Sequence, residues 1–598
     1  MGRRKFVCDF ETTTDPNDCR VWAYGYMEIG NKQNYKIGTN LDEFMEWAIN
    51  SQADLYFHNL RFDGSFIVNW LYRNGYTYNK TGKKNTFYTV ISRMGQWYMI
   101  DICQGYKGKR KIHTVIYDSL KKLPFKVEEI AKSYKLNVLK GEIDYTAYRP
   151  PNHKLTDEEI AYIKNDLEIV ADALQIQFNQ GLEKMTIGLD AISDFKAIIN
   201  RKKFENLFPT VSIQMNENFR LAYRGGFTWV NPKFQNKELE EGIVFDINSM
   251  YPSQMYYKPL PYGLPIYFKG EYQEDPEYPL YIAHIRCDFE IKKDKIPTIQ
   301  IKKNVFKENE YLTSSRGEYP DLYVTNVDWK LIQEHYDLYD VQFLEGWKFR
   351  AKTGFFKQYI EKWMYVKTHN EGAIKQNAKL MLNNLYGKFA TNPDVTNKIP
   401  YLKDDGSLGF TMPKDENGEE IKEFKDPVYT PLAVFITSWA RDEIIRTAQK
   451  VYHRIIYCDT DSMHLLGTEP PKEIADKIDD NKLGFWKHES TFKRAKFIRQ
   501  KTYIEEIYAK WVEKDGERIK KPCGKDEAET TILSVKCAGM PESVKKHVTF
   551  ENFKIGFSYG YDPITGNGNP DEEKDAKLLP KQVPGGVVLM PTIFTIKG

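Results

Sequence analysis

Cysteine is scarce in this 598-residue chain, and its spacing indicates no site. The seven cysteines form no Cys-x-x-Cys pair, so neither a zinc ribbon nor a disulfide framework is indicated, and a reducing compartment fits an odd, scattered set. No apolar run approaches the roughly 20 residues that a membrane span needs. The basic start meets an acidic residue before a signal-peptide core can form. We therefore expect a soluble, intracellular protein.

An excess of charge of either sign is also lacking. The chain has 86 basic and 83 acidic residues, a formal net charge of +3, so the overall balance does not by itself predict a nucleic-acid partner. Acidic sites set in basic grooves would give the same sum. The length favours about three to five domains, and 41% hydrophobic residues, with 40 tyrosines, are ample for several cores.

The most informative stretch is Arg454–Ser462, where a β-rich apolar run leads into Asp459, Thr460 and Asp461. Met463–Leu466 continues beyond it, so the pattern predicts two short strands with carboxylates at the turn between them. Aspartate is unfavourable inside strands. A Mg²⁺ site would account for it, because Mg²⁺ binds one or two carboxylates plus substrate phosphates. An isolated Asp-x-Asp is more often an ordinary acidic turn, so the rest of the chain decides.

A second set of carboxylates lies in the first third of the chain. Asp9 and Glu11 stand two apart in the strand-like run Lys5–Glu11, so they share one face. Asp63 follows a second strand-like run, and Asp166 lies on a helix that a capping box predicts to begin after residue 156. Neighbouring carboxylates repel, and a cation between them relieves the repulsion. A solvated edge strand is the alternative interpretation of the first pair.

Tyr162 lies one helical turn before Asp166, on the same face. In isolation this pair would be a surface contact. Together, however, Asp-x-Glu, Asn-x-x-Phe-Asp and Tyr-x-x-x-Asp resemble the DEDD-type 3′→5′ exonucleases in their tyrosine variant. The resemblance implies a ribonuclease H-like α/β domain with two metal ions, a water oriented by Tyr162, and support from Lys140. It also implies single-strand ligands at Thr12, His58, Asn59, Phe62, Ser119, Leu120 and Tyr145.

The middle of the chain offers a further strand-end carboxylate. Ile243–Ser253 is a buried-strand pattern that reaches Asp246 and then turns at Ser249 and Pro252. A carboxylate followed by free backbone N–H groups suits a metal-bound triphosphate. Upstream, Tyr223–Phe227 reads as a connector whose first two residues can stack on and pair with a nucleic-acid strand; a plain turn is the alternative.

A helix is predicted from about Glu371 to Ala390. Its apolar residues form one stripe, and a second stripe steps by four residues through Lys375, Lys379, Asn383 and Gly387. A lysine stripe alone is usually a solvated face.

These motifs together resemble those of family B DNA polymerases. The run from Asp246 to Pro252 is similar to motif A, with Met250 in place of the usual leucine. Lys379-x-x-x-Asn383-x-x-Tyr386-Gly387 is similar to motif B, and Asn384 stands where serine is usual. Asp459-Thr460-Asp461 is similar to motif C. Thr437 to Arg441 resembles a template-contacting Thr-x-x-Ala-Arg pattern, and Lys501-Thr502-Tyr503 resembles the Lys-x-Tyr motif at the primer terminus.

The resemblance implies template-directed nucleotidyl transfer with two Mg²⁺ ions in each active site, Mn²⁺ being an alternative. Asp246 and Asp461 would hold the metal with Asp459 nearby. Lys379 and Lys501 would offset developing charge. Nucleotide binding is implied for Tyr251, Lys367, Lys375, Lys379, Asn383 and Tyr386. DNA binding is implied for Tyr223, Arg224, Thr437, Arg441, Lys501 and Tyr503.

Motif order and compact length are similar to the protein-primed subgroup of family B over nearly the whole chain. This implies an α+β multidomain fold: an exonuclease domain (1–186), a palm in two parts (187–257 and 429–533), fingers (355–390) and a thumb (534–598). Insertion one (258–354) would dock a terminal protein that serves as primer. Insertion two (391–428) would encircle DNA, giving processivity and strand displacement.

The implied partners are primer–template and single-stranded DNA, dNTPs and the terminal protein, with the chain a monomer or a heterodimer with the latter. It would replicate a linear viral genome in the cytoplasm of a bacterial host. Asp404-Asp405-Gly406 and Glu416-Asn417-Gly418 are hairpin-turn signals in insertion two, whereas Tyr559–Lys581 is predicted to be a mobile loop.

Two other functions compete with this interpretation. One is a 3′→5′ nuclease whose second half only binds DNA, and the other is a catalytically silent replication scaffold. Both predict a broken set of polymerase carboxylates, yet Asp246, Asp459 and Asp461 are all present.

Overall fold

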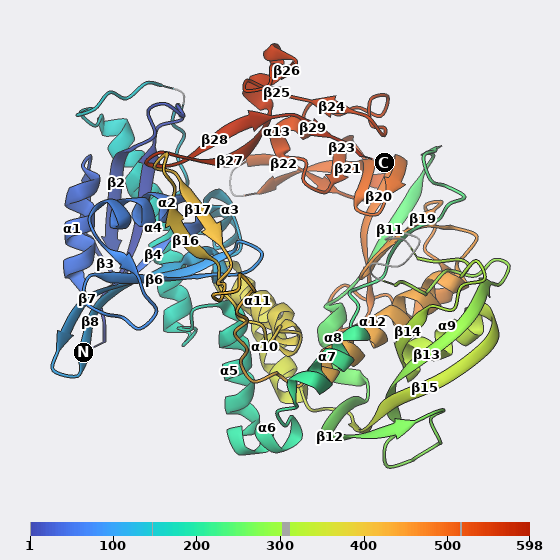
Figure 1. Cartoon of the computed structure of the whole chain (residues 1–598). Coiled ribbons are helices and arrows are strands. Elements are labelled where there is room, and N and C mark those ends of the chain that lie inside the picture. The colour runs from blue at the N-terminus through green and yellow to red at the C-terminus, as the bar shows by residue number, and fades with distance from the viewer. Residues whose placement is uncertain (1, 146, 302–310, 515–516, 598) are drawn as a thin grey trace.

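The computed structural model describes residues 2–145, 147–301, 311–514 and 517–597 (Figure 1). Its α+β multidomain fold contains two large sheets, each with its own helices. Figure 1 shows the first domain on the left and the second sheet on the right, joined below by helices and above by a long hairpin near the C-terminus. None of the helices described is both long and apolar enough to cross a membrane.

The first domain is built on an eight-stranded sheet with the order β3-β2-β1-β4-β8-β7-β6-β5. The central strand β1 pairs in parallel with β4 and antiparallel with β2. The strands are β1 (Lys5–Thr12), β2 (Val21–Glu28), β3 (Asn31–Gly38), β4 (Asp54–Phe57), β5 (Thr77–Tyr78), β6 (Thr86–Ile91), β7 (Trp97–Lys107) and β8 (Arg110–Asp118). The helices are α1 (Leu41–Ser51), α2 (Leu60–Arg73), η1 (Ser119–Lys121), α3 (Val127–Ser133) and α4 (Asp157–Asn179). As predicted, α4 begins with a capping box formed by Thr156 and Glu159.

The second large sheet has nine strands, in the order β22-β21-β20-β11-β19-β18-β9, with β10 on β20 and β23 on β21. They are β9 (Thr228–Val230), β10 (Glu238–Leu239), β11 (Gly242–Ile247), β18 (Ile455–Asp459), β19 (Ser462–Leu466), β20 (Trp486–Arg499), β21 (Thr502–Lys514), β22 (Glu517–Pro522) and β23 (Thr530–Cys537). Because β11 lies between β19 and β20, the end of β11 is placed beside the turn that joins β18 to β19.

A helical layer connects the two sheets. It contains α5 (Ile187–Ile199), α6 (Arg201–Leu207), α7 (Ile213–Leu221), α8 (Met250–Tyr257), α10 (Lys357–His369), α11 (Gly372–Phe389) and α12 (Pro431–Lys450). Their apolar faces share one large core, to which Phe195, Phe356 and Met381 contribute. The predicted helix of about 371–390 is therefore confirmed.

Two further segments are inserted into this frame. The first is a four-stranded sheet, β12-β15-β13-β14, with its own hydrophobic core. Its elements are β12 (Leu260–Lys269), β13 (Leu280–Ile291), β14 (Asp321–Thr325), α9 (Asn326–His335) and β15 (Tyr336–Lys352). The second carries the hairpin β16 (Ile399–Leu402) and β17 (Leu408–Thr411), with Gly406 in the predicted turn.

The prediction of a mobile loop at Tyr559–Lys581 is wrong. The segment forms β24 (Ser558–Tyr559), β25 (Tyr561–Asp562), β26 (Asn567–Gly568), η4 (Pro570–Asp575) and β27 (Lys577–Val583). The turn-forming residues predict the turns correctly but give no sign of the strands between them. β27 is a strand because it pairs with β28 (Gly586–Thr592), which lies outside the segment. The hairpin β27–β28 reaches back to the first domain (Figure 1), where Val587 and Leu408 enter the same core as Phe66 of α2.

Candidate functional site

Three predicted carboxylates converge where β11 meets the β18–β19 turn. Asp246 is opposite Ser462 in the β11–β19 pairing, and Asp459 is opposite the same residue in the β18–β19 pairing. The turn is tight: Asp461 N donates to Asp459 O at 2.6 Å, and Thr460 adopts φ +60°. The main chain of Asp461 also accepts from Ile247 N at 2.8 Å. The sheet therefore fixes the carboxylates of both strands relative to each other.

The electrostatics of this cluster favour a cation. Burial, followed by repulsion from Asp461, raises the pKa of Asp246 to about 7. Burial also raises the pKa of Asp461 to about 6, with Asp459 adding to the shift. In the described part of the chain, no three His, Cys, Asp or Glu side chains are arranged to hold a metal ion by themselves. Two carboxylates plus substrate phosphates, however, are the usual ligands of Mg²⁺, so this pair fits that ion.

Asp459 is engaged by protein groups rather than left open. Lys501 Nζ donates to its two carboxylate oxygens at 2.9 and 3.1 Å, and Tyr457 OH donates to Oδ2 at 3.0 Å. The Lys501 main-chain N–H donates in turn to Tyr457 OH. Asp459 thus holds Lys501 beside Asp246 and Asp461, the two predicted metal ligands.

These carboxylates form one wall of a cavity of about 460 Å³. Lysines from α10 and α11 form another wall, and Lys367 Nζ donates to Ser249 Oγ at 3.1 Å. Burial lowers the pKa of both Lys367 and Lys379, and repulsion from neighbouring lysines lowers it further. The lining residues are Asp246, Ile247, Asn248, Ser249, Met250, Tyr251, Lys367, Lys379, Leu382, Asn383, Tyr386 and Asp461. Lys375 does not line the cavity, although its charge acts on Lys367 and Lys379.

The aromatic floor of the cavity comes from α8 and α11. Tyr251 and Tyr386 stack with centroids 4.1 Å apart and an interplanar angle of 28°. Both rings are packed against the helical core. A cavity with a carboxylate wall, an ammonium wall and an aromatic floor complements a metal-bound triphosphate attached to a sugar and base.

The second predicted carboxylate set also converges. Asp9 and Glu11 come from β1, Asp63 from the first turn of α2, and Asp166 from α4. Burial and then repulsion from Asp166 raise the pKa of Asp9 to about 7, against the lowering effect of Lys140. Burial, followed by repulsion from Asp9, raises the pKa of Glu11 and of Asp63 well above their usual range.

Asp166 shows how this second cluster could take a cation. Its Oδ2 accepts from Lys140 Nζ at 2.6 Å, whereas its buried Oδ1 has no hydrogen-bond partner among the described residues. Burial alone would lower the pKa of Lys140, but Asp166 raises it overall. These four carboxylates are not spaced as a ready-made metal site in the described structure either, but oxygen donors whose negative charges repel one another are the chemistry that a divalent metal binds. Tyr162 OH is hydrogen-bonded to Tyr145 OH beside it.

Five of the predicted single-strand ligands lie around the start of α2, namely His58, Asn59, Phe62, Ser119 and Leu120. Thr12 ends β1, and Tyr145 is hydrogen-bonded to Tyr162 of α4. His58 contacts Ser119 Oγ at 3.0 Å and Phe125 O at 2.8 Å through its two ring nitrogens. Asp118, which sequence reasoning missed, accepts from the main-chain N–H groups of Asn59, Leu60 and Leu120. Its signal was weak, because an aspartate at a strand end before a short helix is an ordinary cap.

Thr437 and Arg441, the residues predicted to contact the template, are both buried in this structure. Thr437 is 1% exposed and donates to Ala433 O within α12. Arg441 is 2% exposed and makes a bidentate ion pair with Asp328 of α9. Its Nη1 also donates to the carbonyl oxygens of residues 224 and 225. Arg441 therefore joins insertion one to α12. The guanidinium of Arg224, another predicted DNA ligand, donates hydrogen bonds to the carbonyl oxygens of residues 300 and 323.

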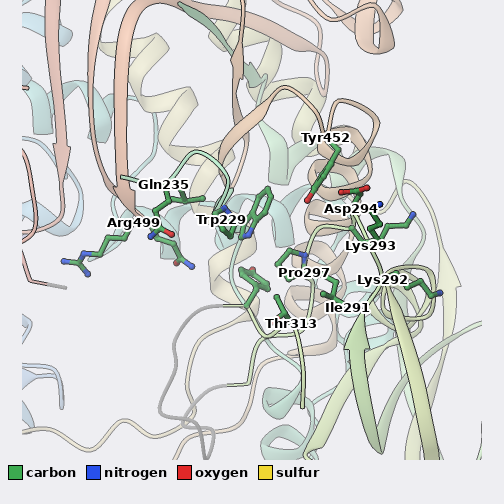
Figure 2. A pocket seen from close by; sticks show the side chains of 15 residues that line it. Trp229, Gln235, Ile291, Lys292, Lys293, Asp294, Pro297, Thr313, Tyr452 and Arg499 are labelled. Atoms are coloured by element: carbon green, nitrogen blue, oxygen red, sulfur yellow. The ribbon is translucent and has the colours of Figure 1, made fainter. Parts of the chain in front are cut away.

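A second cavity, of about 380 Å³, lies between the palm and insertion one. Figure 2 shows Lys292 and Lys293 on one side, Arg499 on the other, and Trp229 between them. Arg499 Nε is buried without a hydrogen-bond partner in the described structure. None of the carboxylates of the two clusters described above lines this cavity, so it is separate from both clusters.

The comparisons with known proteins agree with this geometry. The model of the family "DNA polymerase type B, organellar and viral" matches residues 45–480, and the chain belongs to that family. It is 62% identical to the DNA polymerase of Bacillus phage M2 and 60% identical to that of Bacillus phage phi29, over the full length of each. It is also 32% identical to the DNA polymerase of Streptococcus phage Cp-1, over 99% of this chain and 98% of that one.

Solved structures extend the likeness to three dimensions. Phi29 DNA polymerase complexed with primer-template DNA and incoming nucleotide substrates has a TM-score of 0.92 and 59% identity, with full coverage of both chains. Phi29 DNA polymerase complexed with single-stranded DNA has a TM-score of 0.92 and 58% identity, again with full coverage. The predicted family and the predicted multidomain α+β fold are confirmed.

Proposed function

We propose that this chain is a protein-primed, template-directed DNA polymerase with 3′→5′ proofreading, which replicates a linear viral genome in the cytoplasm of a bacterial host. One observation carries the synthetic activity: Asp246 and Asp461 face Lys367 and Lys379 across a single cavity. The carboxylate wall carries negative charge that a metal ion would balance, and the lysine wall carries positive charge that phosphates would balance. A metal-bound dNTP therefore complements both walls at once. Relatives of this chain were solved with primer-template DNA and incoming nucleotides.

When bound, two Mg²⁺ or Mn²⁺ ions would activate the attacking hydroxyl and neutralise the triphosphate. Asp246 and Asp461 are the residues that would hold them. Lys379 and Lys367 bind the phosphates and offset the charge that develops on the leaving group. Lys501, fixed by Asp459, lies at the primer terminus. The ring of Tyr251 lies against the sugar, where it leaves no room for a 2′-hydroxyl.

Proofreading is assigned to the carboxylates of the first domain. Asp9, Glu11, Asp63 and Asp166 would hold the metal ions beside a frayed 3′ end. Tyr162 orients the attacking water, and Lys140 offsets the charge on the phosphate. The ring of hydrogen bonds around His58, Asn59 and Ser119 fixes the platform on which the single strand lies.

Protein priming is assigned to insertion one and the cavity of Figure 2. At initiation a Ser, Thr or Tyr hydroxyl of the terminal protein takes the place of the primer 3′-hydroxyl. The cavity has a basic rim, including Arg499 with its unpartnered Nε, around the apolar surface of Trp229 and Pro297. An acidic segment with an apolar side chain complements this surface. Insertion two and the β27–β28 hairpin would encircle DNA.

Primer extension tests the proposed function directly. A 5′-labelled primer on a longer template, supplied with Mg²⁺, should lengthen with all four dNTPs and shorten without them. Shortening under both conditions would favour the nuclease alternative and exclude synthesis. A gel shift of the DNA without any change in primer length would favour the silent scaffold. A blocking strand ahead of the primer then tests strand displacement.

Stabilisation by Mg²⁺ should depend on pH. The folded-state pKa values of Asp246 and Asp9, about 7, lie above those of an unfolded chain, so ionisation of these groups destabilises the metal-free protein as pH rises from about 4 to about 7. Mg²⁺ binds the ionised form. We therefore expect Mg²⁺ to raise the thermal midpoint more at about pH 8 than at about pH 5.5. Equal shifts at the two pH values would contradict carboxylate ligation.

A further inference from the structure

Helix α11 belongs to two hydrophobic cores at once. Ala373, near its start, packs in the core of the first domain together with Tyr162. Met381 and Leu385, further along, pack in the core of the connecting helices. The start of the helix packs closely against the first domain, because Gly372 has φ +55° and a Cβ there would lie 3.0 Å from Tyr134 O. The helix that carries the nucleotide-binding lysine is therefore seated on the exonuclease domain (Figure 1).

A fully buried asparagine lies at this junction. Asn377 is 0% exposed, and its Oδ1 accepts from Tyr134 OH at 2.6 Å and from Gln177 Nε2 at 3.1 Å. Its Nδ2 donates to Gln180 Oε1 at 2.6 Å. All three partners come from the first domain, two of them from the C-terminal end of α4. One side chain of α11 thus makes three hydrogen bonds across the domain boundary.

The network continues beyond these partners. Gln177 Nε2 also donates to Lys122 O at 3.2 Å, and Lys122 Nζ donates to Asp190 of α5 at 2.6 Å. Both members of that ion pair are buried. Since α5 packs beside α11, the boundary is held from two sides. Gln177 Oε1 has no hydrogen-bond partner in the part of the chain described, so the network is not arranged for maximal stability.

The position of Asn377 on the helix determines what the network controls. Successive residues of an α-helix are rotated by about 100°, so Asn377 lies on the opposite side from Lys375 and Lys379, each two residues away. Lys379 and Asn383 line the polymerase cavity. A rotation or a slide of α11 that moved Asn377 from its partners would therefore move Lys379 and Asn383 relative to Asp246.

We infer that Asn377 is a positioning residue for the incoming nucleotide. Through Tyr134, Gln177 and Gln180 it fixes the rotation of α11, and thereby the distance from the ammonium wall to the carboxylate wall of the polymerase cavity. The inference rests on the proposed function. It makes the exonuclease domain a structural part of the nucleotide site, because α4 carries Asp166 near its middle and Gln177, with the C-cap Gln180, at its C-terminal end.

Steady-state incorporation of a single dNTP by Asn377→Leu tests this role. Leucine has a similar volume but removes three hydrogen bonds: the Tyr134 hydroxyl loses its acceptor and Gln180 Oε1 loses its donor, while Gln177 Nε2 keeps only Lys122 O and Tyr134 OH. Removing one side of a buried hydrogen-bonded network is the costly way to break it. We expect KM for the dNTP to rise about fivefold and kcat to change less than about twofold, since Lys379 is displaced but the metal-binding carboxylates are not. Excision of single-stranded DNA without dNTPs should stay unchanged. Gln376→Leu makes the same kind of amide-to-apolar change one residue away and should leave KM unchanged.

A compensating pair separates positioning from general damage. Tyr134→Phe combined with Asn377→Leu removes both polar groups of the Tyr134–Asn377 contact, which can be nearly neutral for that contact, and leaves Gln177 and Gln180 unchanged, so KM should return part of the way to that of the parent. Tyr134→Phe alone removes one hydrogen bond and serves if Asn377→Leu does not fold; its KM should rise less.

The outcomes are distinguishable. If the parent chain does not extend a primer, the proposed function is wrong. If the parent extends but Asn377→Leu has an unchanged KM, the inference is wrong. If kcat, excision and the thermal midpoint also fall while KM stays unchanged, Asn377 serves only stability.

Discussion

Asp461→Asn should abolish primer extension while leaving excision of single-stranded DNA intact. Asparagine keeps the shape of the side chain but removes the negative charge, as protonation would. Asp461 and Asp246 are the two carboxylates of the nucleotide cavity. Burial raises the pKa of both, repulsion from Asp461 adds to the rise at Asp246, and repulsion from Asp459 adds to the rise at Asp461, so both carboxylates are destabilised in the absence of a cation. Losing one charge should therefore cost metal affinity and transition-state stabilisation together.

The expected fall in the rate of single-nucleotide incorporation is about a thousandfold or more. Excision should change less than about twofold, because its carboxylates belong to the first domain and share no partner with Asp461. Asp480→Asn, an exposed aspartate outside the cavity, is the matched control and should leave both rates unchanged. Extension by Asp461→Asn at a tenth of the parent rate or more would contradict the assigned metal site, as would a parallel loss of excision.

The carboxylates could be predicted because local pattern fixes them. Asp246 and Asp459 lie at the ends of apolar strands, and Asp166 lies one helical turn after Tyr162 on a helix with a capping box. The sequence pattern of each strand or helix therefore predicts where its carboxylate lies. That β11 would lie between β19 and β20 does not follow from these patterns. The resemblance to family B DNA polymerases implied only that Asp246, Asp459 and Asp461 lie close together, and the strand order shows how the sheet brings them together.

The burial of polar residues could not be predicted in the same way. Arg441 matches a template-contacting pattern, yet its partner Asp328 lies 113 positions earlier in insertion one. Asn377 stands between two lysines of a polar-looking stripe, and its burial depends on Tyr134 and Gln177 of another domain. A local pattern states which face of an element is polar, but not whether a distant segment will cover that face and pair with it.

The carboxylate cluster of the first domain and the nucleotide cavity are also linked by packing contacts that no sequence motif predicts. Val587 of the C-terminal hairpin enters the core beneath α2, and Gln582 Nε2 donates to Ser65 Oγ, two residues after Asp63. At the opposite side, Asn377 ties α11 to α4. The first domain is therefore held both by the last strands of the chain and by the nucleotide-binding helix, so its position relative to the palm depends on both.

Asp9→Asn should remove 3′→5′ excision and leave extension intact. Asp9 lies at the centre of the first-domain cluster, since its charge raises the pKa of Glu11 and of Asp63 and Asp166 in turn raises that of Asp9. Its amide cannot replace the charge that a metal ion needs. We expect excision of labelled single-stranded DNA to fall about a thousandfold, with extension in excess dNTP changed less than about twofold.

The same substitution should make the metal-free protein more stable. The pKa of Asp9 is about 7 in the folded chain and about 3.9 in an unfolded one, so at about pH 8 the ionised carboxylate opposes folding. Asparagine removes that repulsion, and the thermal midpoint without Mg²⁺ should rise, whereas Glu142→Gln, an exposed change near Lys140, should alter neither stability nor excision. A variant that loses excision while gaining stability cannot owe the loss to unfolding. A lower midpoint, or excision that survives the substitution, would mean that Asp9 does not hold the metal.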